Sequence, residues 1–532
     1  MKSPYSQKIL LWPVFASLTK KSTKGTMTLI TAFLFFIFSA LGLSLIYLSQ
    51  IHQKISSFKK NSTLIEYAAE NGIKQGFNNL LSLLAEAPSP VVLSPEEFNE
   101  LRENARSHGT KIIEEFLGLK PPLLISDSWE KLSWKSSMNC TLERIVEEEN
   151  YFRSMYKISI DSEGMLHNLV PKRKSTLSAS LGILAGQLPL PSLPFLVDKK
   201  LKPEEKANFT EKNKISLSPS KKNYIQPKIS FSEEKLIPEE ANSLLSKAFK
   251  TKLFHPQNLS SSKLREILGL EKSEEPVPDG VYLIKDSLGL GGVYVQGDVD
   301  EMILAIEDGF QVIFFRIQLE SWILKYSPSK IKTFFASPDK ISSYDLIPLG
   351  IIIINGKVKS LGGGVVDSIG QAAMVKDEEI PSILQGIQLT IISSDRITLS
   401  SHLIRQGVKW QEGIPYAEDS TSQLMIFSTG KDIWDKTATE GGITIDESSP
   451  EEIKVHASLT ASGKGFSIEG EGKKVQILGS LQATDYVSQE NTLKIIFDDQ
   501  VLDENNASRN VPVTAKPILY IFSFRALDWE EF

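Results

Sequence analysis

The most constraining feature of this chain is an uncharged apolar run from Met27 to Leu48. A bilayer core is spanned by about 20 apolar residues in a helix, so this run is long enough to cross it. The residues before it include no acid and five lysines, Lys2, Lys8, Lys20, Lys21 and Lys24. That asymmetry favours a cytoplasmic N-terminus. We therefore expect a single-pass protein of a bacterial inner membrane, with its C-terminal domain in the periplasm or at the cell surface.

The same run could belong to a cleaved secretory signal. It is longer than the apolar region of a signal peptide, and no small-residue cleavage site of the A-x-A type follows it. We therefore expect an anchor that is retained, or one trimmed only on its cytoplasmic side.

Composition narrows the class of protein and its partners. The chain has 532 residues, of which 41% are hydrophobic and 23% charged, which indicates a globular protein of several domains. Residues 1–60 carry eight lysines and no acid, so the net charge of −6 leaves −14 on the rest. The basic end suits an anionic membrane surface, and the acidic remainder argues against a nucleic-acid partner. The single cysteine, Cys140, cannot form an internal disulfide and is expected to be a small buried side chain.

The anchor continues into an amphipathic helix. No proline occurs from Thr26 to Ala87, and the chain then meets Pro88. Apolar residues recur at helical spacing at Ile65, Ala69, Ile73, Phe77, Leu80, Leu81 and Leu84. The sequence therefore predicts one long helix over residues 26–87.

Two sequence segments of this helix resemble those of a known family. Gly25-Thr26-Met27-Thr28-Leu29-Ile30 looks like a prepilin cleavage region, and Tyr67-Ala68-Ala69-Glu70-Asn71-Gly72 looks like the Ala-Ala-Glu-x-Gly segment of PilX-type minor pilins. Cleavage after Gly25 would place Ile30 at the fifth mature position, where prepilins usually carry Glu. The resemblance implies cleavage between Gly25 and Thr26, and association of the helix with other pilin-like subunits. A plain single-pass anchor is the alternative.

The middle of the chain reads as a mixed α/β segment followed by a linker. Ser94-Pro95-Glu96-Glu97 has the residues of a helix start, and the helix should run to about Leu117. Residues 151–160 alternate as in a strand, and Leu177–Val197 is expected as buried strand and loop. Residues 198–274 are expected to form a flexible linker with short helices.

From residue 275 onward, short β-branched runs alternate with Gly, Asn, Asp and Ser. Many short strands favour a right-handed parallel β-helix, with a β-sandwich as the competing fold. Ile351–Ile354 is continuously apolar, which suits a strand buried on both faces. Stacked coils would place five isoleucines in one interior: Ile352, Ile354, Ile391, Ile426 and Ile477.

The overall expectation is an α+β protein with a transmembrane helix and a mainly β C-terminal domain. Its expected parts are a cytoplasmic leader (1–25), the pilin-like helix (26–87), a mixed α/β segment (88–197), a linker with short helices (198–274) and a β-rich domain (275–532).

The sequence offers little catalytic chemistry. None of the Gly-Lys dipeptides completes a phosphate-binding loop, and the six histidines lack metal-ligand spacing. Asp298, Asp300 and Glu301 form one acidic cluster, and Asp498 and Asp499 form another; acidic turns are the simplest interpretation of both. We expect no catalytic residue, no metal and no cofactor.

The leading functional hypothesis is a non-enzymatic subunit of a type IV pilus or pseudopilus-like assembly, in contact with the inner membrane and other pilin-like subunits. The alternatives are a membrane-tethered adhesin that binds a surface glycan and, third, a β-helix enzyme acting on polysaccharide.

Overall fold

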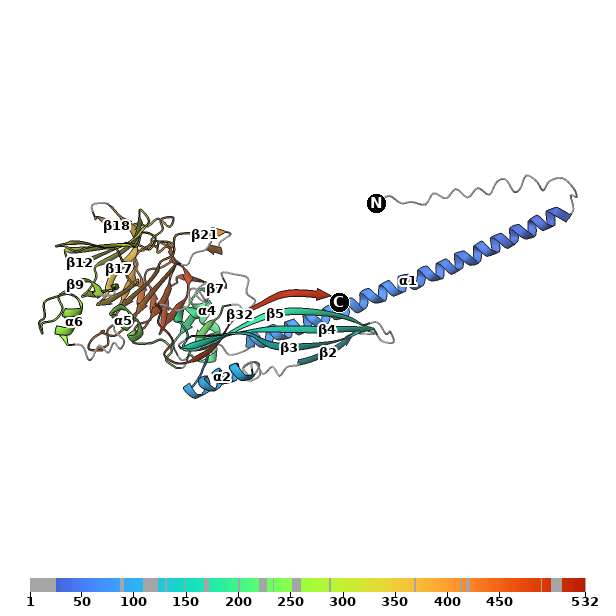
Figure 1. Ribbon diagram of the computed structural model, residues 1–532, viewed down its shortest axis with the longest axis horizontal. Coiled ribbons are helices and arrows are strands. Elements are labelled where there is room, and N and C mark those ends of the chain that lie inside the picture. The colour runs from blue at the N-terminus through green and yellow to red at the C-terminus, as the bar shows by residue number, and fades with distance from the viewer. Residues whose placement is uncertain are drawn as a thin grey trace.

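The protein is elongated, with a long helix at one end and a β-rich head at the other (Figure 1). Between them, a β-sheet lies along the second half of the helix. The computed structural model describes residues 25–86, 90–108, 123–129, 132–148, 150–166, 172–199, 201–219, 227–232, 234–250, 260–286, 289–367, 370–411, 414–417, 422–488, 490–498 and 510–531.

Helix α1 (Gly25–Glu86) is continuous over 62 residues, which confirms the long apolar helix expected from the sequence. Its second half packs across strands β3, β4 and β5. The side chains that it buries there recur at helical spacing: Ile65, Ala69, Ile73, Leu80 and Leu84. Its first half projects beyond the sheet (Figure 1).

The sheet on α1 is antiparallel and contains the C-terminus of the chain. Its order is β1-β32-β5-β4-β3-β2. The strands are β1 (Val91–Val92), β2 (Leu123–Trp129), β3 (Leu132–Glu147), β4 (Tyr151–Leu166), β5 (Arg173–Gly186) and β32 (Ile518–Glu531). Strand β32 therefore returns from the far end of the chain and pairs along β5. Phe77 of α1 stacks on Phe524 of β32 with ring centroids 5.5 Å apart.

Helix α2 (Pro95–His108) begins as the sequence predicts. Ser94 Oγ accepts from the Glu97 N–H at 3.1 Å, and Glu97 accepts from the Ser94 N–H at 2.7 Å, which is a reciprocal capping box. The expected end near Leu117 lies outside the described residues.

The head contains two large sheets, a smaller parallel sheet and a hairpin. The nine-stranded sheet has the order β8-β6-β29-β26-β23-β19-β16-β10-β9. Its strands are β8 (Ile229–Phe231), β6 (Phe195–Val197), β29 (Leu481–Ala483), β26 (Ser458–Ala461), β23 (Gln423–Ser428), β19 (Gln388–Ser393), β16 (Ile351–Asn355), β10 (Gly289–Gln296) and β9 (Gly280–Asp286).

The second large sheet has eleven strands and ends in an antiparallel meander. Its order is β15-β14-β13-β12-β11-β17-β20-β24-β27-β30, with β18 paired to β17. Its strands are β15 (Ile341–Tyr344), β14 (Lys332–Ala336), β13 (Glu320–Ser327), β12 (Phe310–Ile317), β11 (Glu301–Glu307), β17 (Val358–Val366), β18 (Ala372–Met374), β20 (Ile397–Leu399), β24 (Ile443–Ile445), β27 (Phe466–Ile468) and β30 (Tyr486–Ser488).

Smaller elements complete the head. The parallel sheet has the order β25-β28-β31-β7, and β21 pairs with β22 as a hairpin. The strands are β25 (Glu452–Val455), β28 (Lys474–Gly479), β31 (Thr492–Phe497), β7 (Ile215–Pro219), β21 (Val408–Gln411) and β22 (Ile414–Ala417), and the helices are η2 (Leu190–Ser192), α4 (Pro203–Lys212), α5 (Asn242–Ala248) and α6 (Ser261–Ile267).

One column of side chains shows how the core of the head is built. In-register parallel pairing across the nine-stranded sheet places these apolar residues side by side: Val293, Ile352, Ile391, Ile426, Leu459, Leu481, Phe195 and Ile229. All five isoleucines expected in a common interior lie in one buried cluster, which confirms that prediction.

The continuously apolar strand β16 is buried on both faces. Ile352 and Ile354 point into the interior of the head, whereas Ile351 and Ile353 pack in a second cluster with Leu244 and Leu245 of α5. A strand covered on both faces has no position for a polar side chain, which is why the apolar run is unbroken.

Three expectations need revision or qualification. The mainly β character of the C-terminal region is confirmed, but its sheets are mixed, so a right-handed parallel β-helix is not shown. Residues 198–274, expected as a flexible linker, contain strands β7 and β8 besides the short helices α4, α5 and α6. Strand pairing also crosses the expected boundary at residue 275, because β6 pairs with β29 and β7 with β31.

Candidate functional site

The first half of α1 is an apolar surface that nothing in the described chain covers. No part of its most hydrophobic window, of mean hydropathy 2.5, is buried. The helix is long and apolar enough to span a membrane, as a single-pass anchor or a signal sequence. Its large exposed side chains are Leu29, Ile30, Phe33, Leu34, Phe35, Phe36, Ile37, Phe38, Leu41, Leu43, Leu45, Ile46, Tyr47 and Leu48.

The residues expected at a prepilin cleavage site are the first residues of this helix. Gly25, Thr26 and Met27 lie in the first turn of α1, and Leu48 at the other end of the apolar run is 51% exposed. Cleavage between Gly25 and Thr26 stays a prediction.

The Ala-Ala-Glu-x-Gly segment forms a close contact between α1 and the sheet. Ala68 and Ala69 are fully buried. A Cβ on Gly72 would lie 2.1 Å from Ser162 Oγ. A Cβ on Gly164 of β4 would lie only 2.6 Å from the Ala69 backbone nitrogen. Small residues on both elements therefore allow the helix backbone to lie directly on the sheet.

The other residues of that segment face away from this contact. Tyr67 is 56% exposed, and Glu70 is only partly covered. One turn further on, Gln75 accepts a hydrogen bond from Trp134 Nε1 at 2.8 Å, which ties the helix to β3. The packing of the sheet thus accounts for the alanines and the glycine of the segment.

Between the apolar run and the sheet, α1 carries only basic charge. Lys54, Lys59 and Lys60 lie in this stretch, and no acid occurs from Gly25 to Ile65. Ile55 and Phe58 are 48% and 65% exposed in the same stretch. The sequence did not lead us to predict this stretch as a functional surface, although the helical spacing of its apolar residues can be read from the sequence.

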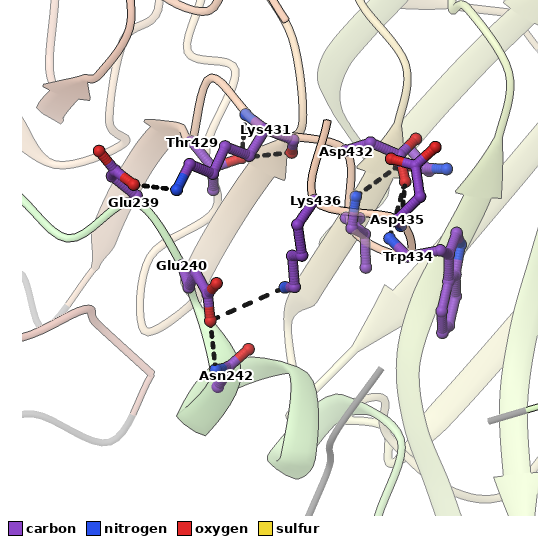
Figure 2. Close-up of polar contacts among 11 residues, drawn as sticks. Glu239, Glu240, Asn242, Thr429, Lys431, Asp432, Trp434, Asp435 and Lys436 are labelled. Carbon is purple, nitrogen blue, oxygen red and sulfur yellow. Dashed lines mark hydrogen bonds and ion pairs between the residues drawn. The ribbon is translucent and has the colours of Figure 1, made fainter. Parts of the chain in front are cut away.

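A group of ion pairs lies within the head, just before α5 (Figure 2). Lys431 pairs with Glu239, and Lys436 Nζ lies 3.8 Å from Glu240, which also accepts from Asn242 Nδ2 at 2.6 Å. Burial lowers the pKa of the Lys436 ammonium from its usual value. We assign this group a structural role, because it joins the segment before α5 to the loop after β23.

The acidic residues in that loop bind the loop's own backbone. Asp432 accepts the N–H groups of Trp434 and Asp435, and Asp435 accepts from Thr437 (Figure 2). Trp434 Nε1 in turn donates to Tyr294 OH at 2.7 Å. Among the residues that the structure places, no group of three or more His, Cys, Asp or Glu could hold a metal ion.

Three of the acidic residues noted in the sequence are engaged in ion pairs, and Asp298 accepts the Lys357 N–H at 3.0 Å. Asp300 lies 2.8 Å from Lys359, which lowers the pKa of that carboxyl, and Glu301 lies 3.0 Å from Arg316. Asp498 is paired with Arg405, whereas Asp499 is outside the described residues. These contacts account for the acids as structural groups; the glycan-binding and enzymatic alternatives stay predictions.

Cys140 is buried, as expected for a lone cysteine. Burial raises the pKa of its thiol to about 12, so the thiolate needed for nucleophilic chemistry is not populated at neutral pH.

Comparison of the chain with protein-family models, curated proteins and solved structures gives no match.

Proposed function

We propose that this chain is a non-enzymatic, single-pass membrane subunit of a type IV pilus or pseudopilus-like assembly, similar to PilX-type minor pilins. One observation carries the proposal: α1 is uncovered and apolar in its first half and packed on a sheet in its second half. Apolar surface of this size is stable only against lipid or other apolar helices. The first half of α1 would then be the anchor and the assembly surface.

The close contact between α1 and the sheet supports the same function. Gly72 and Gly164 leave no space between the two elements, so the sheet is held at a fixed position on the helix. A subunit that presents a domain from a membrane or filament needs such a joint. The bulk of the head would obstruct lateral neighbours, which favours a position at the tip of an assembly.

The topology is tested with a reporter enzyme fused after Phe532 that is active only outside the cytoplasm. The basic leader predicts activity for the whole chain and loss of activity when the five leader lysines are replaced by glutamates. Activity of a cytoplasm-specific reporter at the same position would contradict the proposed orientation.

Processing is tested by mass analysis of the N-terminus of protein extracted from membranes. If a prepilin peptidase acts, the mature chain starts at Thr26, and Gly25→Ala leaves the leader attached. An untrimmed N-terminus in cells with an active peptidase would leave a plain anchor in place of a processed subunit.

We also propose that the parallel part of the head is a β-helix. Three sets of strands support this: β16-β19-β23-β26-β29, β17-β20-β24-β27-β30 and β25-β28-β31 each pair in parallel and in chain order. An experimental structure with antiparallel pairing between β16 and β19 would contradict it.

A further inference from the structure

The part of α1 just outside the apolar run has a narrow apolar stripe. From Gln50 to Thr63 its apolar residues are Ile51, Ile55 and Phe58. They follow one another at spacings of four and three, and the same spacing continues through Ser62 to Ile65, which packs on the sheet. The stripe therefore lies on the same face of α1 that packs on the sheet from Ile65 onward. Over the two turns before the sheet begins, this face is not covered.

Neither the sheet nor the lipid interior covers this stripe. Ile55 is 48% exposed and Phe58 is 65% exposed, whereas Ile65 is buried. Phe58 lies ten residues beyond Leu48, roughly 15 Å along the helix axis at 1.5 Å per residue. Lys54 and Lys59 at the same level keep this stretch out of the hydrocarbon.

Alternating spacings of three and four are those of a helix-to-helix seam. In heptad positions, Ile51 and Phe58 occupy d and Ile55 occupies a. Lys54 then falls at g and Lys59 at e, the two positions that flank such a seam and choose its partner. A neighbouring helix would thus meet an apolar line with a cation on each side.

A second copy in register is the wrong partner for this seam. Two subunits anchored in one membrane run parallel, and each g residue then faces the e residue five positions on in the other helix. Lys54 of each copy would face Lys59 of the other, so both pairs would repel. No acid from Gly25 to Ile65 offsets them.

We propose that the stripe Ile51–Ile55–Phe58 binds the helix of a different subunit, one with its own apolar seam and carboxylates at the e and g positions. The proposal rests on the assembly function given above and specifies the partner: the chain joins as one member of a mixed set of subunits and does not polymerise on itself. The partner is defined by charge complementarity to Lys54 and Lys59.

An acidic copy of the chain serves as the probe for such a partner. The full-length protein is made with two different affinity tags, as wild type and as the Lys54→Glu, Lys59→Glu variant, and reconstituted in uncharged lipid. Wild type mixed with the variant is expected to co-purify roughly tenfold more than wild type with wild type or variant with variant. High salt should reduce this preference.

Lys60→Glu provides a matched control. Residue 60 lies at position f, next to Lys59 in sequence but away from the seam, so this variant should pair with wild type no better than wild type does. Equal pairing in all three mixtures, or an equal gain from Lys60→Glu, would overturn the proposal while leaving helix association intact. No pairing in any mixture would count against lateral association itself.

Cross-linking identifies the register. Phe58→Cys is introduced, in a Cys140→Ser background, into both the wild type and the Lys54→Glu, Lys59→Glu variant. The two proteins should form disulfides with each other, whereas the copy with native lysines should form few with itself. A second test mixes one copy that carries Ile51→Cys with another that carries Phe58→Cys, both with the native lysines. Efficient disulfides between them would show that two copies pair with a shift of one heptad, and would overturn the requirement for a different subunit.

Discussion

Arg405 donates from Nη2 to Asp498 Oδ2 at 2.6 Å inside the head, and both side chains are about 95% buried. Arg405 Nη1 also donates to the Ser422 carbonyl at 2.8 Å. Asp498 follows β31 directly, and Arg405 lies between β20 and β21. The pair therefore ties the end of β31 to the segment between β20 and β21.

Removing one partner should be far more damaging than removing both. Asp498→Asn leaves the Arg405 charge buried and uncompensated, and we expect it to lower the free energy of unfolding by about 3–5 kcal/mol. The double variant Arg405→Met, Asp498→Leu should lose much less. Urea unfolding followed by circular dichroism makes the comparison; equal losses would mean that packing, not charge, dominates this site.

Gly164 should not tolerate a methyl group. In Gly164→Ala the new Cβ would meet the backbone of α1, 2.2 Å from the Ile65 carbonyl oxygen, so the helix must move off the sheet. We expect a loss of about 1–3 kcal/mol in thermal unfolding of the detergent-solubilised protein. Gly42→Ala is the control, because nothing lies within 4 Å of a Cβ there. Identical melting of both variants would contradict a tight helix–sheet contact.

Acid should weaken the head through His456. Burial, reinforced by the charge of Arg405, holds the pKa of His456 well below 6.5, so the folded state keeps it neutral. Below about pH 6.5 the unfolded chain binds a proton that the folded chain does not, and the free energy of unfolding falls by about 1.4 kcal/mol per pH unit. The loss continues as the pH falls, until the pKa of His456 in the folded state is reached. Above pH 6.5, the contribution of His456 to the free energy of unfolding is constant.

His456→Asn isolates that contribution. An amide oxygen can accept from the Arg405 N–H, which donates to His456 Nδ1 at 3.2 Å in the wild type, but it does not titrate. Urea unfolding at pH 7 and pH 5.5 should show a smaller acid loss in the variant. The same pH dependence in both proteins would remove His456 as its source.

A carboxylate in the interior column should disrupt the head. Ile391→Asp places an unpaired carboxyl at a fully buried position, which costs several kcal/mol or forces its protonation. Ile341→Asp on β15 makes the same chemical change at a side chain that is 76% exposed and should be nearly neutral. Protease resistance of the two variants tests this, and comparable tolerance would contradict the common core.

The Phe77–Phe524 contact should couple the two ends of the chain. Phe524 is fully buried, and Phe524→Ala should cost about 3–5 kcal/mol. In a double-mutant cycle with Phe77→Ala, the stacked pair should show a coupling of about 0.5–1.5 kcal/mol. Strict additivity would mean that the stacked pair adds nothing to the strand pairing that holds β32 between β1 and β5.

Local patterns in the sequence determined the long helix α1, the start of helix α2 and the burial of strand β16. The charge-free run and the absence of proline specify α1, the Ser94 and Glu97 pair specifies the start of α2, and the unbroken isoleucines of β16 indicate burial on both faces. Each depends on residues a few positions apart, so hydrogen-bonding and burial preferences of single segments are sufficient to predict it.

Only the tertiary structure decided which segments share a sheet. Strand β32 joins β5 across more than three hundred residues, and β6 and β7 extend the ladders that end in β29 and β31. Short apolar strands are interchangeable in composition, so their partners are chosen by the packing of the whole core. The same holds for the stripe Ile51–Ile55–Phe58: its spacing is written in the sequence, but its exposure follows from where the sheet ends.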